Sequence, residues 1–257
     1  MKIIIKLILI LLFISCNSSL EKWKSYDETE EISKNSSSEN QKLRYKRIQS
    51  ISTDKNILIN GLENEIENFI KTKYDKLKPK IVEKSIPELQ QSVINKDFSY
   101  YDLTLFYLTR IYLIEFNDET YLNSIISINK NILEEAKSKD IKGNSDTYSV
   151  FGIPILLKDN IGFESLPTTA GAHSLQNNYT KDAYIVEKLK EKGALILGKT
   201  NLSEWANYFC SGCPNGYTAL GGQTLNPYGR KKIDTGGSSS GSGAATASNL
   251  TSVSLGS

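Results

Sequence analysis

A lysine and a serine cluster are the residues of this chain with the clearest chemical potential. Lys158 directly follows the apolar run VFGIPILL at residues 150–157, and a glycine-serine loop, GGSSSGSG, occupies residues 236–243. Burying an ammonium group is costly, so a lysine at the end of a buried strand loses its proton more readily than one in water. A neutral amine can accept a proton from a hydroxyl. The pattern predicts proton transfer between Lys158 and a loop serine; the other interpretation is that Lys158 reaches solvent or pairs with Asp159.

The segments around these residues alternate between strand and helix. Residues 150–157 and 194–197 are short apolar runs typical of buried strands, with a helical pattern at residues 182–192 between them. A further helix begins within residues 202–208, and the serine loop leads into an alanine-rich helix at residues 244–250, whose first N–H groups are unpaired. This alternation predicts an α/β fold with a largely covered sheet.

A helical region precedes the strands. Apolar residues recur at three- and four-residue steps over residues 58–77, which predicts one amphipathic helix ending near Pro79. Three more helices are expected, at residues 87–94, 100–115 and 121–139.

The first residues have the composition of a targeting signal. Lys2 and Lys6 lie before and within an apolar run that is too short to span a bilayer, and the run stops at Ser15 and Cys16. This arrangement resembles a bacterial lipoprotein signal, which implies cleavage after residue 15 and lipidation of Cys16. We therefore expect export and lipid anchoring to the bacterial cell membrane, on its periplasmic or surface side. The alternative is an ordinary secretory signal.

Residues 16–51 are rich in Ser, Asn, Glu and Lys and show no apolar period. They are predicted to form a flexible tether between the anchor and a domain at residues 52–257.

Composition argues against several classes of function. The chain has 31 Lys and Arg against 29 Asp and Glu, so its net charge of +2 offers no strong attraction for nucleic acid. One His and three Cys argue against histidine-based zinc chemistry and against a disulfide scaffold. No cofactor or metal is expected. Removing residues 1–15 removes two lysines and leaves a neutral chain, so lipid rather than charge would hold it to a membrane.

A phosphate-loop pattern at residues 193–200, GALILGKT, is a false lead. The pattern needs a flexible loop after a strand, and here the intervening Ala-Leu-Ile-Leu residues are themselves the expected strand.

Several motifs together resemble the amidase signature family. The resemblance covers residues 86–257 and is carried, in order, by GIPILLKDN (152–160), LPTTAG (166–171), DAYIVEKLKEKGALILGKTNLSEWANY (182–208), GGQTLNPYG (221–229) and TGGSSSGSGAATASNL (235–250). It implies the amidase signature fold, a mixed twisted sheet covered by helices on both faces and incomplete here. NLSEWAN, GGQTLNPYG and GSSSGS are more similar to peptide amidases than to the amidotransferase subunit that makes Gln-tRNA.

The resemblance also implies a Ser–Ser–Lys triad. Lys158 is similar to the family's base, and Ser238 to its bridging serine, which sits at a cis peptide bond. The nucleophilic serine would fall about five residues beyond Ser257, judged from motif spacing. Neutral Lys158 would take its proton through Ser238, an acyl-enzyme would form, and water would hydrolyse it.

Other residues receive supporting roles from the resemblance. Gly236, Gly237, Ser239 and Ser240 are expected to support the loop, and Gly212 and Cys213 to line the cleft.

Three smaller signals remain. Cys210 and Cys213 are spaced for a local disulfide in an exported protein. His173 is expected to be a surface residue or to lie behind the site. Lys199 is expected to pair with a nearby carboxylate such as Glu204.

The sequence thus predicts an amidase acting on a small-molecule or peptide amide, inactive without a complementing C-terminal portion. One alternative is an amidotransferase-like subunit, which would need a partner and the cytosol. The other is a catalytically dead, membrane-anchored lipoprotein with a binding role. The DNA beyond codon 257 distinguishes these interpretations.

Overall fold

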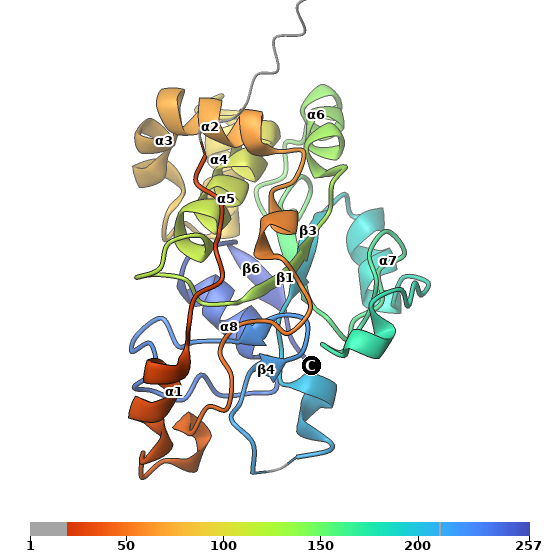
Figure 1. Ribbon diagram of the computed structural model, residues 1–257. Helices are drawn as coiled ribbons and strands as arrows, with labels where there is room; N and C mark the ends of the chain where they lie inside the picture. Colours follow the sequence, from red (N-terminus) through yellow and green to blue (C-terminus); the bar gives the residue numbers. More distant parts are fainter. Residues whose placement is uncertain (1–19, 211) are drawn as a thin grey trace, which may run out of the picture.

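A four-stranded mixed sheet lies at the centre of the molecule (Figure 1). The computed structural model describes residues 20–210 and 212–257, so the predicted signal and Cys16 lie outside the described residues. The strand order is β1–β3–β2–β6, in which β1 runs antiparallel to β3 and the other pairs are parallel. A small hairpin accompanies this sheet. The strands are β1 (Ile125–Ile128), β2 (Pro154–Lys158), β3 (Leu195–Thr200), β4 (Tyr217–Thr218), β5 (Gly222–Gln223) and β6 (Val253–Leu255).

Helices flank the sheet. They are α1 (Thr29–Ser36), α2 (Glu63–Thr72), α3 (Tyr74–Ile81), α4 (Ile86–Ile94), α5 (Tyr100–Glu115), α6 (Ile132–Lys142), α7 (Tyr184–Glu191) and α8 (Ser240–Ala247). Short 3₁₀ helices cover Gln41–Leu43, Lys55–Leu58, His173–Leu175 and Glu204–Asn207. Among the described residues, no helix combines the length and the apolar character needed to cross a membrane.

The predicted α/β class is confirmed. All five residues of β2 and all six of β3 are buried, as expected for strands covered on both faces. Helix α8 lies on one side of the sheet and α7 on the other (Figure 1). The helices α2 to α5 gather at one end of the molecule, where α5 packs against α2, α3 and α6. The carboxyl ends of β2 and β3 point away from this helical end (Figure 1).

The helical region differs from the prediction in two places. Residues 58–77 do not form one helix, because Lys73 leaves helical geometry and separates α2 from α3. Pro79 lies inside α3, which ends two residues later at Ile81. The predicted helix at residues 121–139 is also wrong. Its first part is β1, where three isoleucines favour an extended backbone, and α6 begins only at Ile132.

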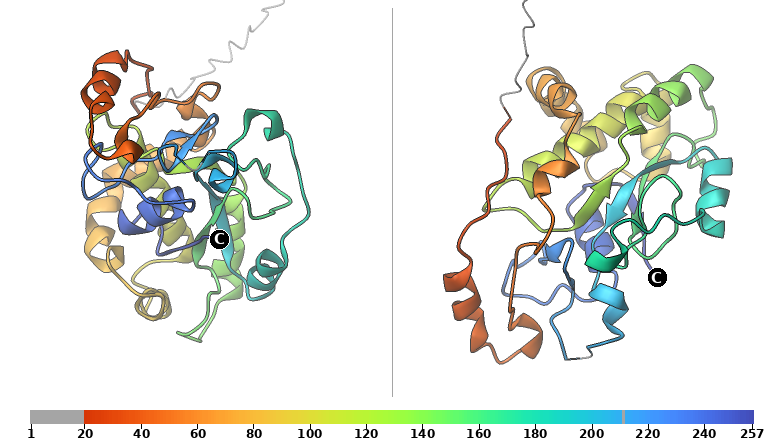
Figure 2. Two further views of the ribbon diagram at one scale, coloured as in Figure 1. Left: turned by 90° about the horizontal axis from the view of Figure 1, so that it is seen from below. Right: turned by 45° about the vertical axis from the view of Figure 1, so that its right-hand side comes forward.

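The described part of the predicted tether, residues 20–51, is not a free linker. It includes α1, and it buries Leu43, Tyr45 and Ile48 against Tyr121, Leu122 and Leu225 of the body. Figure 2 shows this segment running along the outside of the molecule from the helical end to α1. Sequence periodicity missed it because its apolar residues pack from irregular backbone, which has no repeat to detect.

Candidate active site

The end of β2 places the amine of Lys158 among hydroxyl and carbonyl oxygens. Lys158 has no exposed surface, so its amine does not reach solvent. It also forms no ion pair with Asp159, which pairs with Lys199 instead. Its Nζ lies 2.7 Å from Ser238 Oγ, 3.0 Å from Ser257 Oγ and 3.1 Å from the carbonyl oxygen of Ser257. The structure therefore brings the two sequence-predicted residues, Lys158 and Ser238, into direct contact.

Three oxygen atoms thus lie within hydrogen-bond distance of the Lys158 amine. A neutral amine has two N–H groups and one lone pair, whereas an ammonium has three donors. The Ser257 carbonyl can only accept, so one N–H points to it. In the ammonium form, the other two N–H groups donate to the hydroxyls of Ser238 and Ser257. In the neutral form, one hydroxyl would instead donate to the lone pair of Nζ.

Burial favours the neutral form of the Lys158 amine. Desolvation lowers the pKa of Lys158 below its ordinary value. Among the described residues, no Asp or Glu side chain forms an ion pair with this amine that would oppose the shift.

The Gly237–Ser238 peptide is held from outside the serine loop. This peptide bond is cis. Ser203 donates its backbone N–H to the Ser238 carbonyl over 2.9 Å. A Cβ on Gly237 would come within 2.7 Å of Ser203 Oγ and 3.2 Å of Asn215 Oδ1, so this close approach requires glycine. The segment after β3 therefore helps to set the position of Ser238.

The remaining loop serines make supporting hydrogen bonds. Ser240 Oγ donates to the carbonyl of Gly236 over 2.6 Å, across the start of α8. Ser239 Oγ accepts from the backbone N–H of Ser257 over 3.1 Å. Helix α8 itself approaches the sheet closely at Gly241, where a Cβ would lie 2.3 Å from the carbonyl oxygen of Asn201.

Lys199 pairs with a carboxylate, but not with the predicted Glu204. Its Nζ lies 3.5 Å from Asp159 Oδ1, 2.6 Å from the Ile161 carbonyl and 3.1 Å from Thr168 Oγ1. Glu204 instead accepts from the backbone N–H of Ala219. The prediction failed because Asp159 follows β2 and reaches the end of β3 only through the parallel pairing of these strands.

Lys199 and Asp159 form a closed, buried pair. Neither side chain has exposed surface. Burial lowers the pKa of Lys199 and raises that of Asp159, and the charge of each partner opposes the shift of the other. Thr169 Oγ1 also donates to the Asp159 carboxylate.

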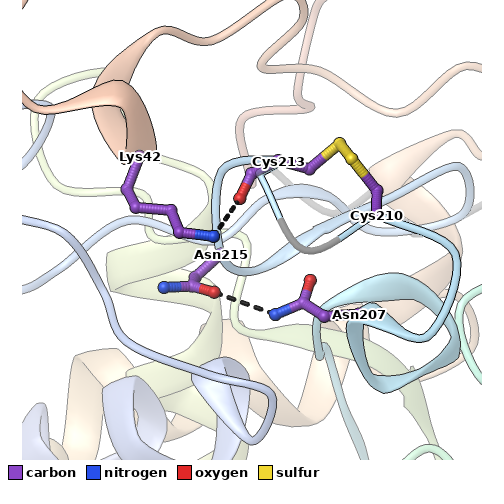
Figure 3. The surroundings of a disulfide bond; sticks show 5 residues. All are labelled: Lys42, Asn207, Cys210, Cys213 and Asn215. Atoms are coloured by element: carbon purple, nitrogen blue, oxygen red, sulfur yellow. Dashed lines mark hydrogen bonds between the residues drawn. A yellow bond between two sulfur atoms is a disulfide. The ribbon is translucent and has the colours of Figure 1, made fainter.

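The predicted disulfide between Cys210 and Cys213 is present, with Cα atoms 5.5 Å apart (Figure 3). The Cys213 carbonyl accepts from Lys42 Nζ over 2.8 Å, and Asn207 Nδ2 donates to Asn215 Oδ1 over 2.9 Å. Through this hydrogen bond, the Cys213 carbonyl contacts Lys42 of the N-terminal segment and not Lys158. Gly212 is exposed in the same loop, and a Cβ there would meet open space.

His173 is exposed in a short 3₁₀ helix, in agreement with its predicted surface position. Among the described residues, no group of three or more His, Cys, Asp or Glu side chains is arranged to hold a metal ion.

Sequence reasoning missed three residues of this cluster. Ser257 contacts Lys158, Asn160 Nδ2 donates to Ser257 Oγ over 3.0 Å, and Ser203 bonds the Ser238 carbonyl. Asn160 had a signal, because it follows Lys158 by two residues at the end of a strand. Ser203 and Ser257 carry no local signal, because only tertiary pairing brings them to the site.

Comparison with known proteins identifies the family of this fold. The model of the amidase family matches residues 102–257, more than half of the chain. The chain therefore belongs to the amidase family.

Solved structures agree with this assignment. An amidase family protein from Bacillus anthracis is 36% identical, with a TM-score of 0.75 over 82% of this chain and 42% of that one. A peptide amidase from Stenotrophomonas maltophilia is 40% identical, with a TM-score of 0.62 over 67% of this chain and 36% of that one.

Among curated relatives, a glutamyl-tRNA(Gln) amidotransferase subunit from Legionella pneumophila is 37% identical over 176 residues. The match covers 67% of this chain and 34% of that protein. The chain thus spans well under half the length of each of these relatives. At the level of the family, this membership supports the hydrolysis of amide bonds.

Proposed function

We propose that this chain supplies the proton-transfer pair, Lys158 and Ser238, of an enzyme that hydrolyses carbon–nitrogen amide bonds. The observation that carries the proposal is the 2.7 Å contact between Ser238 Oγ and a fully buried Lys158 amine. Buried amines lose protons more readily than exposed ones, so Lys158 is suited to act as a base near neutral pH.

In the proposed reaction, the nucleophilic serine hydroxyl attacks the amide carbonyl. That serine is expected beyond Ser257. Its proton passes to Ser238 Oγ while the Ser238 proton passes to Lys158 Nζ. The tetrahedral intermediate expels ammonia or an amine, which takes the proton back along the same path. Water then attacks the acyl-enzyme with the same base, releasing the acid and restoring the serine.

An amidotransferase-like subunit is a second candidate. The identity of 37% to a glutamyl-tRNA(Gln) amidotransferase subunit favours it. The expected export signal argues against it, because tRNA lies in the cytosol. The expected signal and the NLSEWAN and GSSSGS motifs favour an exported amidase that acts on a small-molecule or peptide amide.

The proposal extends to location and partners. Lipidation of Cys16 would hold the protein at the outer side of the bacterial cell membrane, and the nucleophile would come from a C-terminal portion, continuous or separate. If no such portion exists, the cluster at Lys158 would serve a binding lipoprotein without catalysis.

Activity should be tested on a polypeptide that includes the sequence encoded beyond codon 257. Ammonia release from a C-terminally amidated dipeptide is the assay. We expect Lys158→Ala and Ser238→Ala each to lower turnover by about a thousandfold or more, because removing one member disables the whole relay.

Matched controls are Lys137→Ala and Ser138→Ala on α6. Their side chains hydrogen-bond to Glu134 and Glu135 of the same helix, and Lys137 Nζ lies 5.3 Å from the centre of the Tyr101 ring. Both controls should keep full turnover. Near-normal turnover of Lys158→Ala, with circular dichroism unchanged, would disprove the assigned base. Unrelated sequence after a true stop codon would favour the binding lipoprotein.

A further inference from the structure

The N-terminal segment is fixed to the helical end of the molecule from its first described residue. Leu20 packs against the main hydrophobic core, and the Glu21 carbonyl accepts from Tyr112 of α5 over 3.3 Å. Trp23 and Asn56 then exchange two hydrogen bonds of 2.9 and 3.0 Å. These contacts hold Leu20 beside α5, at the helical end of the molecule where α2 and α3 also lie (Figure 1).

The ring of Trp23 is held as well. It packs edge to face against Tyr121 at 5.1 Å, and Lys55 Nζ lies 4.0 Å from its centre. The attachment therefore combines hydrogen bonds, aromatic packing and a cation–π contact.

This attachment leaves little chain for a tether. Only four residue steps separate Cys16 from Leu20, and an extended chain covers at most about 14 Å in four residues. The described body has the size of a domain about 45 Å across. A 36-residue flexible linker would instead span about 33 Å on average and would let the body turn freely.

We infer that the helical end of this protein lies on the lipid surface, with α2 and α3 facing the headgroups. The inference rests on the proposed lipidation of Cys16. With an acyl chain there, the membrane surface must pass close to Leu20, and the faces beyond the reach of the tether cannot approach it.

The charges of this face are nearly balanced. Residues 63–84, which include α2 and α3, carry six lysines and five carboxylates, Glu63, Glu65, Glu67, Asp75 and Glu83. Lys71, Lys73, Lys80 and Lys84 pair with Glu67, Asp102, Asp97 and Glu88, whereas Lys76 and Lys78 form no ion pair within the described part of the chain. The exposed Lys22 and Lys24 flank Trp23. Charge therefore adds little to the orientation, which the short tether sets.

The orientation turns the Lys158 cluster away from the bilayer. Ser257, which contacts Lys158, lies in the half of the molecule away from α2 and α3 (Figures 1 and 2). Its substrates would then arrive from the aqueous phase rather than from the lipid.

The orientation can be measured by energy transfer from single labels. Thr72→Cys places a thiol at the end of α2, and Ser36→Cys places one at the end of α1, at the opposite end of the molecule (Figure 1). The two sites are matched, because each native hydroxyl donates to a carbonyl of its own helix over 2.7 Å. Cys210 and Cys213 form a disulfide and do not react.

The full chain is produced in a bacterial host, labelled with a donor and inserted into phosphatidylcholine–phosphatidylglycerol vesicles with acceptor on the headgroups. We expect transfer from residue 72 to be at least about twofold more efficient than from residue 36, given the width of the domain. Cys16→Ser, combined with either label, should remain unbound.

Mass spectrometry of the bound protein separates the two ways in which the inference can fail. Equal transfer from both sites, or more from residue 36, with an acyl chain present at Cys16 would overturn the orientation alone. Absence of the acyl chain would overturn the proposed anchor, and the orientation with it.

Discussion

Two lysines at the ends of neighbouring strands differ in their partners. Lys158 is the last residue of β2, and Lys199 lies in β3 opposite Leu157. Both lysines therefore lie at the same end of the sheet. Both are fully buried. Lys199 faces the carboxylate of Asp159, whereas Lys158 faces the hydroxyls of Ser238 and Ser257 and a carbonyl.

The difference shows that burial alone does not produce a base. Desolvation lowers the pKa of both lysines, but only at Lys199 does a carboxylate oppose the shift. At Lys199 the Asp159 carboxylate thus favours the charged form, which makes this lysine less suited to act as a base. Lys158 is suited to exchange a proton with a hydroxyl, which is the role proposed for it.

The largest expected contrast is in stability. Lys199→Met leaves the Asp159 carboxylate buried without its partner, and such a loss costs about 3–5 kcal/mol. Lys158→Met removes hydrogen bonds to partly exposed groups only and should cost about 1 kcal/mol. Urea unfolding followed by circular dichroism measures both values. In the double variant Asp159→Asn/Lys199→Met, part of the loss should return. Equal costs for the two single variants would contradict the comparison.

The titration of the two amines should respond differently to Asp159→Asn. Removing the carboxylate should lower the pKa of Lys199 further, because a close opposite charge no longer favours the ammonium form. Lys158 should titrate as before, because Asp159 is not among its hydrogen-bond partners. Carbon NMR of isotope-labelled lysine side chains follows each amine. An equal shift at Lys158 would mean that the two amines share one electrostatic site.

The pH dependence of stability should report the lowered pKa of Lys158. The folded state holds Lys158 at a lowered pKa, so between that pKa and the unfolded value the unfolded chain binds more protons. Stability then rises with pH in this window, by up to about 1.4 kcal/mol per pH unit. Lys158→Met should show a smaller rise, because Lys158 no longer contributes to it, whereas the lowered pKa of Lys199 still acts in this direction. Urea titrations at several pH values up to about 10 measure it, and parallel curves for the two proteins would argue against a lowered pKa.

The smallest expected effect concerns Asn160. Its amide donates to Ser257 Oγ at the exposed edge of the cluster, so Asn160→Ala should change the free energy of unfolding by no more than about 0.5 kcal/mol. Urea unfolding beside Lys158→Met provides the scale. A loss larger than that of Lys158→Met would show that the hydroxyl cluster, rather than the amine, holds this edge together.

Much of this arrangement follows from sequence. The apolar runs before Lys158 and around Leu197 predicted β2 and β3. A helix was predicted at residues 244–250, whereas α8 begins four residues earlier, at Ser240, and ends at Ala247. The proximity of Lys158 and Ser238, however, came from the family resemblance. They are 80 residues apart, and no local pattern records which strand ends meet.

The errors have physical causes. Glu204 is nearer than Asp159 to Lys199 in sequence, but parallel pairing of β2 with β3 makes Asp159 the neighbour in space. The isoleucines of β1 fit a helical spacing, yet their pairing with β3 decides their conformation. Tertiary contacts, which a single sequence does not state, overrode local preference in both cases.

The packed N-terminal segment has a practical consequence for producing the protein. The sequence suggests a domain boundary at residue 52. A recombinant version that starts there would lack Leu43, Tyr45 and Ile48 and would expose Tyr121, Leu122 and Leu225 to solvent. Such a version should aggregate and be poorly soluble, because it exposes an apolar patch. A version that starts at or before Leu20 would keep this cover in place.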